Sequence, residues 1–341
     1  SNTGQYQIGD TFYNYYSAAA YDPDLKWEST TTYNGGLDYG FLNGRLFGSI
    51  DVYSKETKDL LSTIDIPVGT NFNNRLTTNV GNMENKGIEA SINFAAIKSD
   101  NMNWDFGFNV AYNKRKVTNL TLNPDPKFKI DAGGIAGGVG TNIKYNTINQ
   151  TPGSFYVYKQ VYSTDGKPLE NVYVDLNGDG TINSEDQYFY KSPDPDFLFG
   201  FTTAFNYKKW TLNTVLRASV GNYVYDNVSS NFGIKTNILS GSGIINNAGP
   251  DIYNTSFSTA QYLSDYYLHN ASFLKMDNLS LSYNPGKLFK NNGTTLRVSV
   301  NCQNVFTVSD YNGLDPELPT GIDYNLYPRP RTYTLGLNIG F

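Results

Sequence analysis

The sequence has one cysteine and one histidine among its 341 residues. With Cys302 alone, no disulfide can form within the chain. A Ser-His-Asp triad or a two-histidine metal site would have to use His269 or do without histidine. Because Leu268 and Asn270 beside it form no recognisable motif, the sequence predicts that the protein is not an enzyme.

Charged residues are also scarce, at 17% of the chain, against roughly 25% in soluble domains. The net charge of −5 argues against nucleic acid as a partner, because phosphate binding needs a basic surface. Aromatic residues reach 15%, with 28 tyrosines, and there are 32 glycines. This composition suits β-structure with many turns and aromatic girdles at a lipid boundary, although a secreted β-sandwich can share it.

No stretch approaches the ~18 consecutive apolar residues that predict a transmembrane helix. Ser1 opens a polar, tyrosine-rich run without the basic-then-apolar pattern of a signal peptide. We therefore expect a mature chain or one that starts internally.

Apolar and polar residues alternate along most of the chain, which is the pattern of strands with one apolar face. The C-terminus shows it most clearly, since Tyr333, Leu335, Leu337, Ile339 and Phe341 are apolar and the residues between them are small or polar. Eleven strands are predicted on this basis, at 25–42, 45–60, 80–98, 103–117, 138–149, 153–163, 197–207, 209–222, 270–284, 294–306 and 329–341.

Short and long connections alternate between these predicted strands. An outer-membrane barrel has this order, with short periplasmic turns and long extracellular loops. The fold expected is therefore an all-β, transmembrane, antiparallel up-and-down barrel. Bacterial single-chain barrels close with even strand numbers, and an open edge in lipid is very costly. Eleven strands are thus expected to be completed by residues outside this sequence.

A twelve-residue run from Asp175 to Asp186 is the clearest local motif. Its spacing is that of a calcium loop, in which oxygen ligands alternate and a glycine, here Gly180, allows a sharp turn. Asp186 replaces the glutamate of an EF-hand and the flanks are strand-like, which is nearer to dockerin loops; an Asx-rich turn without an ion is the alternative. We expect a structural Ca²⁺ in the extracellular loop 164–196, held by Asp175, Asn177, Asp179, Asn183, Asp186 and the carbonyl of Thr181.

Several segments together resemble SusC/RagA-type TonB-dependent outer-membrane transporters of Bacteroidetes. They are spread over nearly the whole chain and keep the order of that family. The segments are Asp22–Glu28, Asn79–Glu89, the loop 175–186, Pro193–Asp196 with Gly200, Gly221–Tyr225 and the ending Tyr327–Phe341.

The resemblance implies that residues 1–341 are the C-terminal part of a 22-stranded barrel in the outer membrane. It implies import of glycans or peptides through the barrel, with an N-terminal plug, coupling to TonB and a SusD-like surface lipoprotein. The plug and the TonB box are expected in the remaining N-terminal part. The alternation from Tyr333 to Phe341 matches the signal for barrel insertion, with Tyr333, Leu335, Leu337, Ile339 and Phe341 on the lipid side.

Aromatic side chains in the long loops are candidates for stacking on cargo. Arg217 and Arg297 fall on predicted lumen faces, where they can also form ion pairs within the wall. Loop packing or contact with the lipoprotein would equally explain the aromatic residues. The substrate-binding candidates are Tyr223, Tyr225, Tyr266, Tyr311 and Tyr324.

Three other functions stay open at this point. A secreted, calcium-stiffened β-rich binding module would dissolve without detergent, unlike a barrel. An outer-membrane enzyme would need a clustered catalytic set, and a receptor for a siderophore or vitamin would share the barrel. The start at Ser1 suggests either a transporter nicked by a protease in an exposed loop or an isolated fragment.

Overall fold

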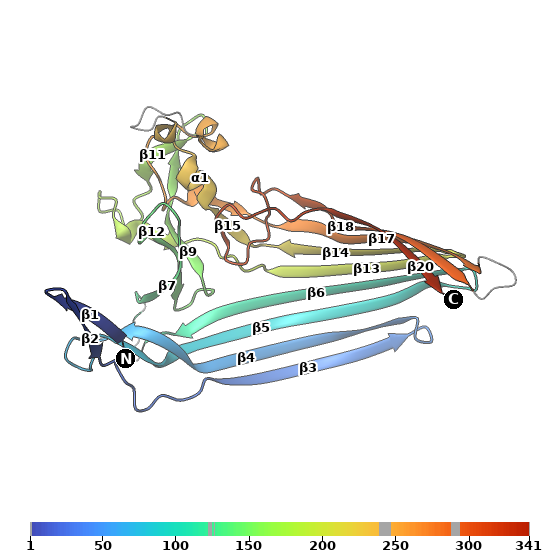
Figure 1. Cartoon of the computed structure of the whole chain (residues 1–341), viewed down its shortest axis with the longest axis horizontal. Helices are drawn as coiled ribbons and strands as arrows, with labels where there is room; N and C mark the ends of the chain where they lie inside the picture. The colour runs from blue at the N-terminus through green and yellow to red at the C-terminus, as the bar shows by residue number, and fades with distance from the viewer. Residues whose placement is uncertain (1, 122–124, 126, 239–246, 288–293, 341) are drawn as a thin grey trace.

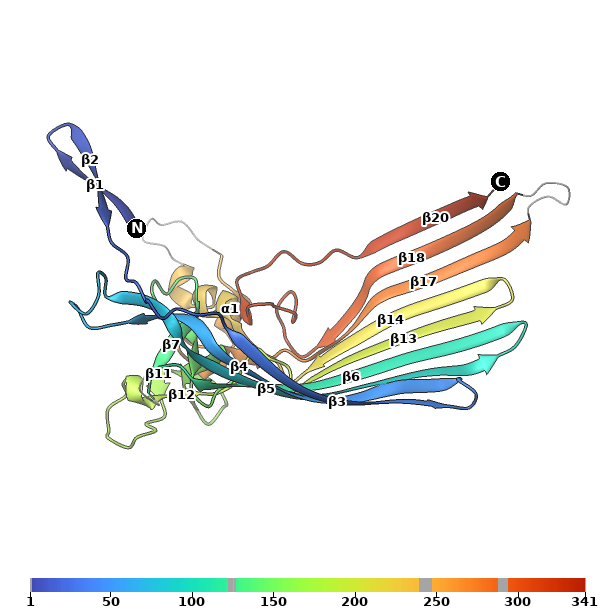
Figure 2. The same cartoon turned by 90° about the horizontal axis from the view of Figure 1, so that it is seen from below.

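The computed structural model describes residues 2–121, 125, 127–238, 247–287 and 294–340. Its main element is a nine-stranded antiparallel sheet whose strand order follows the chain. Figures 1 and 2 show a long, curved, open sheet, with β3 and β20 at its two edges. The strands are β3 (Ser29–Phe41), β4 (Leu46–Asp65), β5 (Arg75–Lys98), β6 (Met102–Asn119), β13 (Phe197–Tyr207), β14 (Trp210–Val220), β17 (Phe273–Lys287), β18 (Thr295–Ser309) and β20 (Thr332–Gly340).

The prediction of eleven barrel strands was wrong by two. Residues 138–149 and 153–163 do not join the large sheet, and β6 pairs directly with β13. Their alternating residues Ile143, Phe155 and Val157 are fully buried in a core between loops, so the period of two reflects that small core and not lipid. Nine is still an odd number, so the expectation of an incomplete barrel is unchanged.

The two faces of the sheet differ in polarity from β4 across to β17. Residues directly opposite each other on paired strands share a face. One row is polar or small, and the neighbouring row is apolar, as in a barrel with a wet lumen and a lipid-facing wall. The polar row runs through Ser49, Ser91, Asn109, Gly200, Arg217 and Lys275, and the apolar row through Ile50, Ala90, Val110, Phe199, Ala218 and Leu274.

Aromatic side chains form a band on the apolar face near the short turns. Trp104 and Phe205 meet edge to face at 5.6 Å between ring centroids. Trp210 and Tyr283 lie 4.6 Å apart on the next strand pair. Amphipathic rings at this level are typical of a membrane–water interface, so this end of the sheet lies at one boundary of the bilayer.

The long connections gather at the other end of the sheet and fold together into a loop domain (Figure 1). Among the described residues, no helix is long and apolar enough to cross a bilayer. A separate hairpin, β1 (Asn2–Ile8) and β2 (Thr11–Ser17), precedes the sheet. The loop domain contains β7 (Lys129–Gly134), β8 (Asn142–Thr147), β9 (Ser154–Tyr158), β10 (Gln160–Tyr162), β11 (Pro168–Tyr173), η1 (Ser184–Asp186), β12 (Gln187–Phe189), β15 (Tyr223–Asp226), α1 (Asn227–Phe232), η2 (Lys235–Asn237), η3 (Pro250–Tyr253), η4 (Asp265–Tyr267), β16 (Leu268–Asn270) and β19 (Ile322–Asp323).

Three loops that are far apart in sequence share the core of this domain. Phe155 comes from the loop after β6, Tyr267 from the loop after β14, and Ile322 from the loop after β18. The strands β15, β16 and β19 form one small sheet, in which β15 and β19 are parallel. The loops therefore form one packed body at the mouth of the barrel wall.

Candidate functional site

The predicted metal loop forms a series of tight turns held by its own side chains. The Asp175 carboxylate accepts hydrogen bonds from the backbone N–H groups of Gly178 and Gly180, at 2.7 and 2.8 Å. Both glycines have positive φ angles, 74° and 81°, which glycine adopts without strain. Asn177 and Asp179 each accept one further backbone hydrogen bond, from residues two positions along the chain.

Asp186 closes this loop from a fully buried position. Backbone N–H groups of Asn183, Leu176 and Asn177 donate to its carboxylate and hold its pKa below the usual range. Asn183 in turn caps η1 by accepting from the N–H of Glu185. In the described part of the chain, no three His, Cys, Asp or Glu side chains lie close enough together to hold a metal. The carboxylates thus close turns, and calcium binding stays a prediction.

Two of the five predicted substrate-binding tyrosines are core residues. The Tyr225 side chain is fully buried, and its hydroxyl donates to the carbonyl of Tyr262 at 2.6 Å. Tyr311 is 6% exposed and donates to Asp323 at 2.6 Å. Tyr225 has no exposed surface and Tyr311 has little, so both rings pack within the loop domain, and contact of these two residues with cargo stays a prediction.

The other three predicted tyrosines are more accessible. Tyr266 is half-buried, and its hydroxyl donates to Asp251 at 2.8 Å. Tyr324 is 43% exposed. Tyr223 lies edge-on to Tyr190, with the ammonium of Lys191 4.7 Å from the centre of its ring.

Tyr223 and Tyr190 also line a polar hollow of about 360 Å³ where the loop domain meets the wall. Gln150 and Asn270 contribute amides to this hollow, and Asp196 contributes a carboxylate. An aromatic ring beside hydrogen-bonding side chains is the pattern of a site for a polar ligand.

His269 lies in β16, paired with Val224. Burial lowers its pKa, although the nearby carboxylates of Asp226 and Asp251 oppose this effect. The neutral imidazole is therefore favoured, with its ring 6.1 Å from that of Tyr311.

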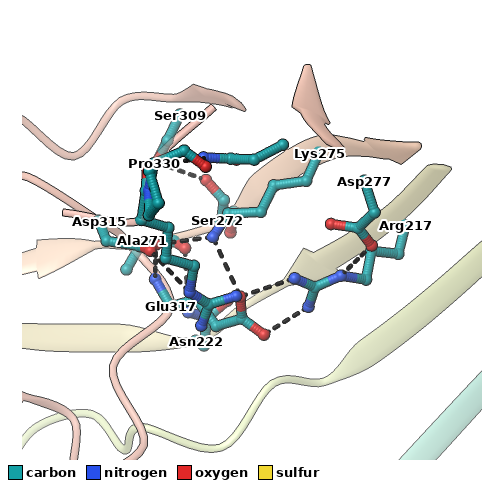
Figure 3. Close-up of polar contacts among 12 residues, drawn as sticks. Arg217, Asn222, Ala271, Ser272, Lys275, Asp277, Ser309, Asp315, Glu317 and Pro330 are labelled. Atoms are coloured by element: carbon teal, nitrogen blue, oxygen red, sulfur yellow. Dashed lines mark hydrogen bonds and ion pairs between the residues drawn. The ribbon is translucent and has the colours of Figure 1, made fainter. Parts of the chain in front are cut away.

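A network of six charged side chains joins the polar face of the sheet to the loop after β18, and Figure 3 shows Arg217, Lys275 and Glu317 at its centre. Arg217 of β14 lies opposite Lys275 of β17 in the sheet register. The Arg217 Nε donates to Asp277 at 2.5 Å, and its Nη2 donates to Glu317 at 2.7 Å. The sequence places Arg217 on the lumen face and leaves an ion pair within the wall as its alternative role, and the structure shows Arg217 in such an ion pair with Asp277.

Lys275 is the buried member of this network, with 2% of its surface exposed. Its ammonium donates to Asp315 at 2.7 Å and to Glu317 at 3.0 Å. Arg329 completes the network, 2.8 Å from Glu317 and 3.3 Å from Asp315. Burial raises the pKa of Glu317, but hydrogen bonds from Arg217 and Lys275 outweigh it and lower that pKa to about 2.

The predicted insertion signal is exposed on the apolar face of β20. Tyr333, Leu335, Leu337 and Ile339 are 70%, 69%, 66% and 50% exposed, and they alternate with residues of the other face. Phe341 lies outside the described residues. Arg297, on the predicted lumen face of β18, donates to the Ser282 hydroxyl at 3.2 Å.

Curated proteins similar to this chain include two TonB-dependent receptors. The chain is 44% identical to the TonB-dependent receptor SusC of Bacteroides thetaiotaomicron, over 99% of this chain and 34% of that protein. A TonB-dependent receptor of Formosa agariphila is 31% identical, over 93% of this chain and 34% of that protein. The chain spans about a third of the length of these relatives.

A solved structure of the RagAB peptide transporter has the same fold, with a TM-score of 0.77 at 24% identity. This match covers all of this chain and 38% of that one. A family model described as "TonB dependent receptor-like, beta-barrel" matches residues 2–305. The predicted barrel fold and outer-membrane location are confirmed, and the chain belongs to the TonB-dependent receptor-like β-barrel family.

Proposed function

We propose that this chain forms the C-terminal part of the wall of an outer-membrane importer for glycans or peptides. The observation that carries the proposal is the two-faced sheet, with a continuous polar row on one side and apolar residues on the other. Such a wall separates a wet lumen from lipid. The similarity to SusC and to the RagAB peptide transporter supports import and favours transport over catalysis.

The partners follow from the same proposal. The free edges of β3 and β20 would pair with strands of the remaining N-terminal part, which would also carry the plug and the contact with TonB. A SusD-like lipoprotein would cover the mouth formed by the loop domain. Mass spectrometry of the detergent-purified complex tests both points, since the N-terminal part and a lipoprotein should co-purify with this chain.

Uptake by cells tests the import itself. A strain lacking the full-length gene should lose growth on the cargo class and regain it when the gene is restored. Parallel cultures on oligosaccharides, on peptides and under iron limitation distinguish the two proposed cargo classes from a siderophore. Loss of growth under iron limitation alone would reject the proposal in favour of a siderophore receptor.

We further propose that Tyr223 and Tyr324 contact the cargo. Their support is partial exposure, and for Tyr223 the adjoining polar hollow. Stacking on an aromatic ring suits the apolar faces of sugars and of peptide side chains alike. Tyr223→Ala should weaken uptake at low cargo concentration, whereas Tyr253→Ala, at a side chain that is 80% exposed, is the matched control.

Calcium binding by the loop 175–186 is a separate proposal. Its support is the spacing of Asp175, Asn177, Asp179, Asn183 and Asp186 and the carbonyl of Thr181. Bound Ca²⁺ would replace several of the turn hydrogen bonds and stiffen the loop. Isothermal titration of the chelator-treated full-length protein with Ca²⁺ should give a saturable signal that Asp179→Ala removes. An unchanged signal in that variant would reject the loop as the site.

A further inference from the structure

Glu317 is surrounded by three cationic side chains. Arg217 binds both of its carboxylate oxygens, Lys275 donates to it at 3.0 Å, and Arg329 lies 2.8 Å away. The three cations come from two wall strands and from the loop itself. A planar carboxylate held by a guanidinium fork and a buried ammonium is among the strongest polar contacts in proteins. We call Arg217, Lys275 and Arg329 the cradle.

The charges of the network balance only while a carboxylate occupies the cradle. Asp277 contacts Arg217, and Asp315 contacts Lys275 and Arg329. With Glu317 in place, three cations face three anions. Removal of its carboxylate would leave three cations facing two anions, with Lys275 almost fully buried. The cradle without Glu317 would therefore attract another carboxylate.

A cavity of about 510 Å³ lies directly beside this contact. Arg217 and Glu317 both line it, so their ion pair can be reached from the hollow. The remaining surface is partly apolar, with Leu198 and Phe273 on the wall side. The volume is in the range of small-ligand sites, and a ligand carboxylate in this cavity would lie beside the guanidinium of Arg217.

Glu317 also holds its loop against the wall. It belongs to the segment 310–331, and Asp315 of the same segment is tied to Lys275. Displacement of Glu317 from the cradle would remove the contacts of this segment with Arg217 and one of its contacts with Lys275. A ligand carboxylate and the carboxylate of Glu317 therefore cannot occupy the same donors of Arg217 and Lys275 at one time.

We propose that the cradle is a carboxylate-exchange site, which Glu317 occupies in the free protein and from which an acidic ligand displaces it. The ligand class is a carboxylate-bearing oligomer, such as an acidic peptide or an acidic sugar chain. Its arrival releases Glu317 from the inner wall, while Asp315 of the same segment keeps its contact with Lys275. The inference rests on the proposed function in one respect, that the polar face of the sheet is reachable by cargo.

The test is direct binding to the full-length transporter in detergent, measured by fluorescence anisotropy. The probes are tri-glutamate and tri-glutamine peptides of the same length, both labelled with fluorescein in the same way and both amidated at the C-terminus, so that they differ only in the side-chain carboxylates. Glu317→Gln keeps the shape of the side chain and removes the internal competitor, so tri-glutamate should bind on the order of tenfold more tightly than to the native protein. Arg217→Gln should abolish the binding, and tri-glutamine should bind neither protein.

Asp59→Asn is the matched control, since Asp59 forms an ion pair with Lys26 at the surface, outside the cradle. This variant should bind tri-glutamate as the native protein does. Equal affinities of the native and Glu317→Gln proteins, or equal binding of the two peptides, would overturn the exchange.

Hydrogen exchange tests the release of the loop in the same samples. Saturating tri-glutamate should speed exchange in residues 314–319 of the native protein, around Glu317, and leave β19 and the strands of the large sheet unchanged. Binding without this change would reject displacement of Glu317. Because neither measurement involves transport, a transporter that imports cargo but fails both tests would refute the exchange and leave the proposed function intact.

Discussion

The low pKa of Glu317 links the docking of its loop to pH. The pKa falls from 4.5 to about 2, because hydrogen bonds and charge from Arg217 and Lys275 outweigh burial. A carboxylate with a depressed pKa stabilises the folded state above its unfolded pKa, and this contribution is lost as the pH falls toward the folded pKa. The docked loop should therefore be insensitive to pH between 7 and 5 and loosen below about pH 4.5.

Limited proteolysis of the segment 310–331 across this pH range checks the prediction. Cleavage should rise between pH 4.5 and 2.5 with an acid-active protease, and Glu317→Gln should show the loosened pattern already at pH 7. A native loop that is cleaved equally at pH 7 and pH 3 would contradict it.

Lys275 should matter for stability far more than a surface lysine. Lys275→Met removes a buried cation and leaves Asp315 and Glu317 short of a partner, which should cost about 3 kcal/mol. Lys26→Met breaks an exposed pair with Asp59 and should cost less than about 1 kcal/mol. Urea unfolding of the full-length barrel in lipid vesicles compares the two variants, and equal midpoints would show that the network does not stabilise the wall.

At the scale of single elements, the two faces of β5 make a direct test of the membrane wall. Ile92 lies on the apolar face and is 38% exposed, whereas Asn93 beside it lies on the polar face. Arginine on the lipid side of a barrel costs about 2–4 kcal/mol near the middle of the bilayer. Ile92→Arg should therefore reduce the yield of folded barrel, and Asn93→Arg should leave it near the native level.

Electrophoresis without heating measures that yield, because a folded barrel migrates differently from the unfolded chain. The reverse order of the two variants would mean that the assignment of the faces is inverted.

A mutation in the core of the loop domain should destabilise that domain without destabilising the large sheet. Phe155 is fully buried in the core that the loops share, and Phe→Ala changes in cores cost about 3–5 kcal/mol. Phe155→Ala should accelerate hydrogen exchange in β8, β9 and β15 while the large sheet stays protected. Tyr253→Ala, at an exposed side chain, is the control, and slow exchange throughout both variants would show that the loops do not depend on this core.

The nine wall strands could be predicted from sequence, but the loop domain could not. The alternation of apolar and polar residues identifies β20 and β6, because one face of each strand contacts the lipid and must be apolar throughout. The same alternation at Ile143, Phe155 and Val157 misleads, since a small core buries one face of a short strand just as lipid does. The two segments wrongly predicted as wall strands both lie in the long connection between β6 and β13. Without them, short and long connections still alternate along the large sheet.

The cradle shows the same limit among charged residues. Lys275 shares a sheet row with Arg217, so the alternation in β17 could have identified it. Glu317 and Arg329 lie in an irregular segment, and no local sequence pattern predicts that their side chains form ion pairs at the wall. The buried positions of Tyr225 and Tyr311 were missed for the same reason, because burial in a loop depends on other loops.

At the scale of the whole molecule, the open sheet should not be stable by itself. The edges β3 and β20 expose unpaired backbone groups, and the apolar face exposes large side chains such as Tyr333 and Leu335. The chain produced alone should aggregate or require detergent. Co-production with the N-terminal part should give a folded barrel, and size-exclusion chromatography with light scattering distinguishes the two. A soluble, monomeric chain without detergent would contradict the membrane wall.

The shared core of the loops has a consequence for the order in which the molecule forms. Ile322 of β19 pairs in parallel beside Tyr225 of β15, although β17 and β18 lie between them in the chain. The loop domain therefore cannot reach its final packing until β18 has formed and the loop after it lies beside β15. Contacts of such long sequence separation form slowly. Packing of the loop domain is thus a late kinetic event, and a protease added to newly inserted molecules should cleave these loops before their shared core has formed.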